Sequence, residues 1–238
     1  MVNSEDMDKS LKKIIIPGWA VQPEACSAMG TGNSFVYDFD FFHGTGAGAV
    51  INFNKNMMML CASPCILHAH SLGAMLALGC LDQLGSAKAL VIWSGFAKFA
   101  KDDGNDHGQD PGAIESMEKQ LLQNPSGLVK SFYRTMYSPG KYNGRIPDVF
   151  NIPALAAGLD CLLKCDFRKK LAEIRTPVLI LHGNEDRIAD VELASVLSGS
   201  LESSSLKIFN GAGHALPFTH PDEAGLVVDK FLRVHDVI

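Results

Sequence analysis

Residues 65–76 read Cys-Ile-Leu-His-Ala-His-Ser-Leu-Gly-Ala-Met-Leu, an apolar run followed by a turn of small residues and an apolar helical pattern. This order predicts a strand, a sharp turn centred on Ser71, and a helix. The turn strains the backbone at its centre, so the residues two before and two after must be small, and they are Ala69 and Gly73. A hydroxyl placed there projects above a helix N-terminus, which favours negative charge. We therefore predict that Ser71 is a nucleophile. The alternative is a helix N-cap after a buried strand.

The composition is typical of one large globular domain. The chain has 238 residues, of which 47% are hydrophobic and 20% charged, and its net charge is −5. The acidic balance disfavours nucleic-acid binding, and no apolar run approaches the roughly 18 residues of a membrane span. Residues 1–6 are too polar for a signal peptide, and six cysteines without an export signal favour a reducing compartment. We expect a cytoplasmic monomer without nucleic-acid or membrane partners.

Most of the predicted strands are uniformly apolar runs, whereas residues 35–41 alternate apolar and polar side chains, and helical patterns lie between the strands. We expect strands at 12–16, 35–41, 65–68, 89–94, 177–182 and 205–209, and helices at 51–61, 74–84, 190–198 and 221–235, with residues 69–73 forming the turn between the third strand and its helix. Strands that are apolar on both faces belong to a parallel sheet covered by helices on both sides. Three consecutive methionines in the first helix, Met57, Met58 and Met59, are expected to fill the core.

The alternation stops between about residues 97 and 170. A polar loop is followed there by short helices broken at four prolines: Pro125, Pro139, Pro147 and Pro153. An insertion at the carboxyl edge of the sheet would lie over Ser71. We therefore predict a core of residues 1–96 and 171–238, with a helical lid of residues 97–170 inserted in it.

A nucleophilic serine needs a histidine base, and that histidine needs a carboxylate to orient it. Asp186 and His214 each lie in a loop just after an apolar strand. The carboxyl ends of parallel strands meet at one edge of the sheet, so we predict a catalytic triad of Ser71, Asp186 and His214. Glu185 and Asp190 are alternative acids. Three other histidines are expected to be structural, the last as a helix cap: His68, His70 and His220.

An acyl-transfer site also needs two donors for the oxyanion. We predict the backbone N–H groups of Leu72, which follows the nucleophile, and of Trp19, in the loop after the first strand. Gly18 would allow that loop to approach closely, and plain packing is the alternative role for Trp19.

No cofactor or metal is expected. The pairs Cys61–Cys65 and Cys161–Cys165 have a spacing that could suggest metal ligands, but they lie in apolar stretches and are interpreted as packing residues. Residues 44–48 contain a Gly-x-Gly pattern without the helix and acidic residue of a dinucleotide site, so we interpret them as a turn.

Taken together, the Gly18-Trp19 turn, the Ser71 elbow, Gly183-x-x-Asp186 and Gly213-His214 resemble the α/β-hydrolase superfamily over residues 12–235. Within it, the chain resembles the pimeloyl-acyl-carrier-protein methyl ester esterases of biotin synthesis. The finer likeness rests on residues 18–20, 71–73, 89–94, 158–162, 166–171, 212–218 and 220–221, several of which related small-ester hydrolases share. The resemblance implies an α/β-hydrolase fold with a mostly parallel sheet, helices on both faces and a helical lid.

The chain departs from this family in three places. Ala69 replaces the first glycine of the elbow, no histidine precedes Gly18, and few residues precede Lys12. The last departure leaves no room for the family's leading hairpin, so we expect a sheet of about six strands.

The resemblance also implies the residues that contact the substrate. These are the loop tryptophan, the nucleophile and its neighbour, the histidine base and a lid-helix segment: Trp19, Ser71, Leu72, His214, Phe132, Tyr133, Arg134, Thr135 and Met136. Residues 119–145 hold five basic and no acidic side chains. Four of them are predicted to form a patch that steers an acidic acyl carrier protein: Lys130, Arg134, Lys141 and Arg145. The alternative is a solvated helix face.

These features predict a serine carboxylesterase that hydrolyses the methyl ester of pimeloyl-acyl-carrier protein through an acyl-enzyme. One alternative is a hydrolase of the same fold that acts on another small soluble ester or thioester. The other is a non-catalytic binding protein on the same scaffold.

Overall fold

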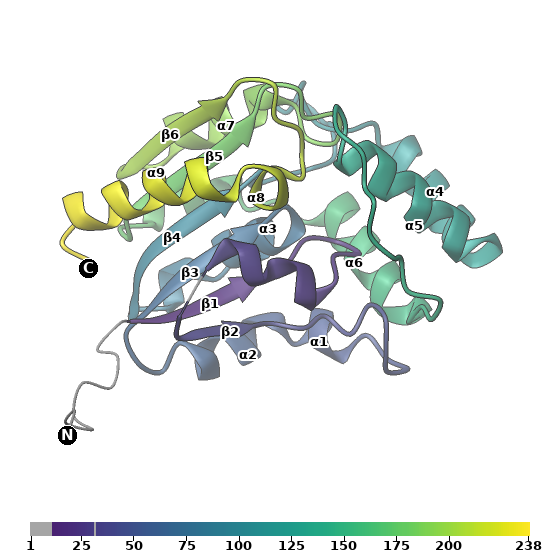
Figure 1. The fold of residues 1–238 in the computed structure, drawn as a ribbon, viewed down its shortest axis with the longest axis horizontal. Coiled ribbons are helices and arrows are strands. Elements are labelled where there is room, and N and C mark those ends of the chain that lie inside the picture. The colour runs from purple at the N-terminus through teal and green to yellow at the C-terminus, as the bar shows by residue number, and fades with distance from the viewer. Residues whose placement is uncertain (1–10, 31) are drawn as a thin grey trace.

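A six-stranded sheet of order β2-β1-β3-β4-β5-β6 forms the centre of the computed structural model, which describes residues 11–30 and 32–238 (Figure 1). The strands are β1 (Lys12–Ile16), β2 (Ser34–Val36), β3 (Cys65–His70), β4 (Ala87–Trp93), β5 (Val178–Gly183) and β6 (Ser204–Phe209). Every neighbouring pair is parallel. The prediction of about six mostly parallel strands is confirmed. Residues 1–11, which the sequence predicts to be a polar segment before the first strand, lie outside the described residues except for Leu11.

Helices cover both faces of the sheet. In Figure 1, the face toward the viewer carries α8 (Leu216–Thr219), α9 (Pro221–Val234) and the 3-10 helix η1 (Pro23–Met29), and the far face carries α3 (Leu72–Leu78) and α7 (Val191–Ser200). The chain also forms α1 (Gly48–Ile51), α2 (Phe53–Leu60), η2 (Leu81–Gln83) and η3 (Arg168–Glu173). All six residues of β3 are buried, because this central strand is covered from both sides.

Strand order reverses between β1 and β3, and this reversal positions the candidate site. β1 pairs with β2 on one side and with β3 on the other, so the loops after β1 and β3 leave the sheet beside each other. In this register Ile16 lies opposite Ala69. Open parallel sheets bind ligands at such a switch point.

Two local predictions need correction. The strand expected at 35–41 is only β2: the last bond to β1 is from Tyr37 N to Ile15 O at 2.8 Å, and the aromatic rings of Tyr37, Phe39 and Phe41 then pack against one another in the core. Of the three consecutive methionines, Met57 is buried but Met58 and Met59 are 55% and 61% exposed. Three successive residues of a helix point in widely different directions, so they cannot all face one core.

The expected lid residues contain α4 (Pro111–Gln123), α5 (Pro125–Met136) and α6 (Ile152–Lys164). Pro125 and Pro153 lie in the first turns of α5 and α6, where a missing N–H costs nothing. The Asn124 side chain caps α5 by accepting a hydrogen bond from Gly127 N at 2.9 Å. Figure 1 shows α4 and α5 at one end of the sheet. That these helices act as a lid stays a prediction.

Candidate active site

Ser71 lies in a strained turn between β3 and α3. Its φ is +52° and its ψ is −117°, a conformation that costs a residue with a side chain roughly 1–3 kcal/mol. The Ser71 N–H donates to Trp93 O at 3.0 Å, which ties the turn to the end of β4. A β-carbon at position 73 would lie 2.4 Å from Pro17 O, so only glycine fits there. Ala69 is fully buried inside β3, and the turn closes with alanine in place of the usual glycine.

The structure brings the three predicted triad residues together. His214 Nε2 lies 2.9 Å from Ser71 Oγ, and His214 Nδ1 lies 2.7 Å from Asp186 Oδ2. The three side chains come from the loops after β3, β5 and β6. With its proton on Nδ1, the imidazole donates to Asp186 and its Nε2 can accept the serine proton.

Asp186 is buried but remains a carboxylate. Burial alone would raise its pKa, but the neighbouring His214 and His182 and the hydrogen bonds it accepts hold that pKa below the ordinary value. Its second oxygen accepts from the backbone N–H groups of Ile188 and Ala189 at 2.8 and 2.9 Å. The alternative acids Glu185 and Asp190 are exposed, and Asp190 caps α7 through Glu192 N. The arrangement therefore favours Asp186 as the acid.

His70 holds the backbone of the candidate base, His214, through a hydrogen bond. Its Nε2 donates to the backbone oxygen of His214 at 3.0 Å. Burial, followed by the neighbouring His214, lowers the pKa of His70 to about 3, so the ring is neutral. The expectation that His70 is structural agrees with these contacts. His220 occupies the N-cap position of α9, as expected, but its side chain makes no capping hydrogen bond, and its Nδ1 lies 2.8 Å from Thr219 Oγ1.

Two backbone N–H groups near Ser71, those of Leu72 and Trp19, have no acceptor among the described residues. Leu72 is the first residue of α3, so its N–H has no partner within the helix. Within residues 11–30 and 32–238, the Trp19 N–H also lacks an acceptor. A β-carbon at Gly18 would lie 3.0 Å from Ser71 Cβ, which shows how closely this loop approaches. The Trp19 indole packs as well, donating to Leu155 O at 2.9 Å. That Trp19 and Leu72 form an oxyanion hole stays a prediction.

A cavity of about 240 Å³ opens beside Ser71. Its walls are mostly apolar and come largely from α4, α5 and α6. The lining residues are Trp19, Ser71, Phe99, Gln109, Ala113, Ile114, Met117, Gln120, Leu128, Ser131, Phe132, Thr135, Leu159, Leu162, Arg187 and Ile188.

Only part of the predicted substrate-contacting set lines this cavity. Trp19, Ser71, Phe132 and Thr135 do, whereas five others do not: Leu72, His214, Tyr133, Arg134 and Met136. On α5, residues 128, 131, 132 and 135 share one face at helical spacing, and residues 133, 134 and 136 point elsewhere. The Tyr133 hydroxyl, for example, donates to Ala20 O at 2.9 Å.

Several cavity residues were missed in the sequence. Ile114 and Met117 lie three residues apart on α4, and this spacing predicts that both face the same side of a helix. Phe99 and Arg187 lie in loops that carry no periodic signal, so only the fold places them beside Ser71.

Three of the four residues in the predicted basic patch line one surface groove, and that the patch steers a carrier protein stays a prediction. Lys130, Arg134 and Lys141 line a surface groove of about 460 Å³. Arg145 does not line it, and its guanidinium pairs instead with Asp148 at 2.6 Å. The charge of Arg145 is therefore offset by an acidic residue that lies just beyond the acid-free stretch. We call Lys130, Arg134 and Lys141 the basic groove.

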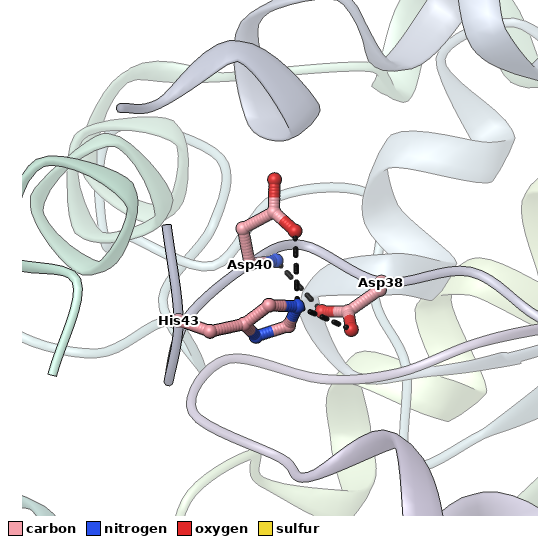
Figure 2. A group of neighbouring side chains, drawn as sticks. All are labelled: Asp38, Asp40 and His43. Atoms are coloured by element: carbon pink, nitrogen blue, oxygen red, sulfur yellow. Dashed lines mark hydrogen bonds and ion pairs between the residues drawn. The ribbon is translucent and has the colours of Figure 1, made fainter. Parts of the chain in front are cut away.

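One group within the described residues has the composition of a metal site. Figure 2 shows His43 facing the carboxylates of Asp38 and Asp40. His43 Nε2 lies 3.2 Å from Asp38 Oδ2 and 3.4 Å from Asp40 Oδ1, and all three side chains are at least partly exposed. The imidazole already contacts both carboxylates, and these contacts lie at the protein surface. No such group in the described part of the chain includes a cysteine. In the same residues, no helix is long and apolar enough to cross a bilayer.

Comparisons with known proteins agree with this fold. A model of the alpha/beta hydrolase family matches residues 26–224. A pimeloyl-[acyl-carrier protein] methyl ester esterase from Nitrosospira multiformis is 25% identical over 180 residues, or 71% of this chain and 68% of that protein. A bromoperoxidase from Bacillus anthracis has a TM-score of 0.81 at 18% identity, over 94% of this chain and 92% of that one. An esterase from Exiguobacterium antarcticum has a TM-score of 0.77 at 18% identity, over 95% and 92%. At these identities the two structures show a shared fold.

Proposed function

Because this chain belongs to the alpha/beta hydrolase family, we propose that it is a serine carboxylesterase that works through an acyl-enzyme. One observation carries the proposal: a continuous hydrogen-bonded chain runs from Ser71 Oγ through His214 to the buried carboxylate of Asp186. The strained backbone at Ser71 holds this residue in the lining of an apolar cavity. Strain of this kind persists where the surrounding structure holds it, and it clusters at functional sites.

The reaction follows from these contacts. His214 Nε2 accepts the Ser71 proton while Oγ attacks the ester carbonyl, and Asp186 stabilises the imidazolium that forms. The N–H groups of Trp19 and Leu72 donate to the developing oxyanion. His214 then protonates the departing alkoxide, which leaves as an alcohol. Water then attacks the acyl-enzyme while the same Nε2 takes its proton, and His214 passes that proton to Ser71 Oγ as the acid is released.

We further propose the methyl ester of pimeloyl-acyl-carrier protein as the substrate. The named relative acts on that ester, the cavity has apolar walls suited to a short acyl chain, and the basic groove on α5 and the loop after it could attract an acidic carrier. The main alternative is another small soluble ester or thioester, and a non-catalytic binding protein is a second. Mass spectrometry of the carrier-bound methyl ester, before and after incubation with the enzyme, tests the first proposal directly.

Charge reversal in the basic groove tests whether the substrate is carrier-bound or a free ester. Lys130→Glu combined with Arg134→Glu is expected to lower kcat/KM for the carrier-bound methyl ester by about tenfold at low salt, because electrostatic steering is lost. Hydrolysis of p-nitrophenyl acetate by the same variant should stay unchanged. Arg145→Glu is the matched control, since Arg145 is already paired with Asp148. Equal carrier-ester hydrolysis by parent and double variant would favour the free small ester.

The cavity wall on α5 predicts a chain-length effect. Thr135→Phe should fill part of the cavity and lower kcat/KM for p-nitrophenyl octanoate about tenfold, since each lost buried methylene is worth about 0.8 kcal/mol. The acetate ester should be affected much less. Arg134→Phe, at the next position but outside the cavity, is the control and should leave both esters unchanged. If kcat/KM for p-nitrophenyl octanoate fell equally in both variants, acyl chains would not occupy this cavity.

A further inference from the structure

A second and larger groove lies on the other side of the sheet from α3. It has a volume of about 870 Å³ and lies between the strands, the end of η1 and α9. Figure 1 shows α9 crossing this face of the sheet. Its floor includes Ile66 and His68 of β3 and Trp93 of β4, and its apolar walls include Met29, Val228 and Leu232. Ligand pockets in proteins are commonly of this size. We call it the α9 groove.

The floor of the α9 groove carries buried polar atoms without partners. Both ring nitrogens of His68 and the indole Nε1 of Trp93 have no hydrogen-bond partner within the described residues. Each side chain is only 2% exposed, and their rings stack at a centroid distance of 6.3 Å. Leaving a buried donor or acceptor unpaired costs about 1–3 kcal/mol, and native structures rarely keep several together. Neither ring takes part in the triad.

The charges around these atoms select the kind of molecule that fits. Two acidic side chains, Asp222 and Asp229 of α9, and one basic side chain, Lys13 of β1, line the groove. Because the acidic side chains outnumber the basic one, the lining disfavours an anionic ligand such as a fatty acid. Burial, followed by the nearby Lys13 ammonium, lowers the pKa of His68 to about 3, and the ring is neutral. A neutral His68 offers one donor and one acceptor, and Trp93 offers one donor. A hydroxyl group, with one donor and two acceptor sites, complements this set.

We propose that the α9 groove is a second binding site, separate from the Ser71 cavity, for an uncharged amphipathic alcohol. The hydroxyl bonds to His68 and Trp93 on the floor, and the hydrocarbon body lies between the sheet and α9. The site does not depend on the proposed esterase activity, because it uses neither the triad nor the cavity around it. Trp93 nevertheless links the two regions, since its backbone oxygen accepts from Ser71 N–H.

The chain holds two tryptophans, and this makes the test specific. In protein labelled with ¹⁵N-tryptophan, the two indole N–H signals are assigned with the Trp19→Phe variant. Titration with 1-octanol is expected to move the Trp93 signal saturably. Octanoate has the same chain but a negative charge, and its affinity should be at least about tenfold lower than that of 1-octanol. His68→Phe should weaken 1-octanol binding by about tenfold, because one hydrogen-bonding partner is lost.

A variant that fills the α9 groove with a side chain provides a control that leaves His68 and Trp93 unchanged. Gly225 of α9 lines the groove, and a β-carbon there meets no atom within 4 Å, so Gly225→Leu should occupy the space and abolish the Trp93 shift. Gly199→Leu on α7, also with no atom within 4 Å, should leave binding intact. Three results would overturn the proposal: no saturable Trp93 shift, as for a groove holding water only; equal binding of octanoate; or an undiminished shift in Gly225→Leu. None of these results bears on ester hydrolysis by Ser71.

Discussion

Ser71→Ala is expected to reduce kcat for p-nitrophenyl acetate by at least about 10⁴-fold, because the attacking oxygen is removed while the rest of the site remains. The loss should be seen in steady-state kinetics at saturating substrate. Folding should be retained, since alanine is smaller than serine and the turn is held by Ser71 N–H and by the fit of Gly73. Circular dichroism and thermal unfolding would check that the variant is native.

Ser94 is a matched control for this experiment. It follows β4 directly, is fully buried and has a positive φ of 49°, close to that of Ser71. Its hydroxyl has no partner within the described residues, and so it is not hydrogen-bonded to His214. Ser94→Ala should therefore keep nearly full activity. If Ser71→Ala were as active as the parent, Ser71 would not be the nucleophile, and a parent inactive on every short ester would favour a binding protein.

Asp186→Asn is expected to lower kcat by about 10³–10⁴-fold with little change in the fold. The asparagine oxygen can still accept from Ile188 N and Ala189 N, so the loop keeps its anchors. The amide NH₂, however, would face His214 Nδ1 and favour the tautomer with its proton on Nε2. In that form Nε2 cannot accept the Ser71 proton. The pre-steady-state rate of acyl-enzyme formation measures this step.

The neighbouring Glu185 tests whether the acid is correctly assigned. It lies in the same loop but is exposed, so Glu185→Gln should hydrolyse p-nitrophenyl acetate at the parental rate. Loss of activity in Glu185→Gln with retention in Asp186→Asn would move the acid to Glu185. A similar moderate loss in both variants would instead point to a general effect of loop charge.

The parallel sheet and the meeting of Ser71, Asp186 and His214 could be predicted from the sequence because both depend on local signals. A fully apolar run of five or six residues predicts a buried strand wherever it lies. Loops that follow parallel strands share one edge, so three chemically matched residues in such loops come together without knowledge of strand order. The small residues around Ser71 reflect a backbone constraint within one turn.

The side-chain directions in the inserted helices could not be predicted in the same way. The resemblance pointed to a continuous run from Phe132 to Met136, yet only Phe132 and Thr135 line the cavity. Which face of α5 turns inward is decided by its packing against other elements, including the Tyr133 bond to Ala20. The pairing of Arg145 with Asp148 likewise depends on how the chain turns after α5.

The sequence by itself therefore determined the class of fold, the strained serine turn and the three residues of the candidate triad, because each is encoded in a few adjacent residues. The tertiary structure alone decided which side chains surround Ser71 and that His68 and Trp93 meet under α9. The physical reason is that cavities form between elements far apart in the chain. The shape of a cavity depends on how these elements cross and pack against one another, and no local pattern of residues predicts that arrangement.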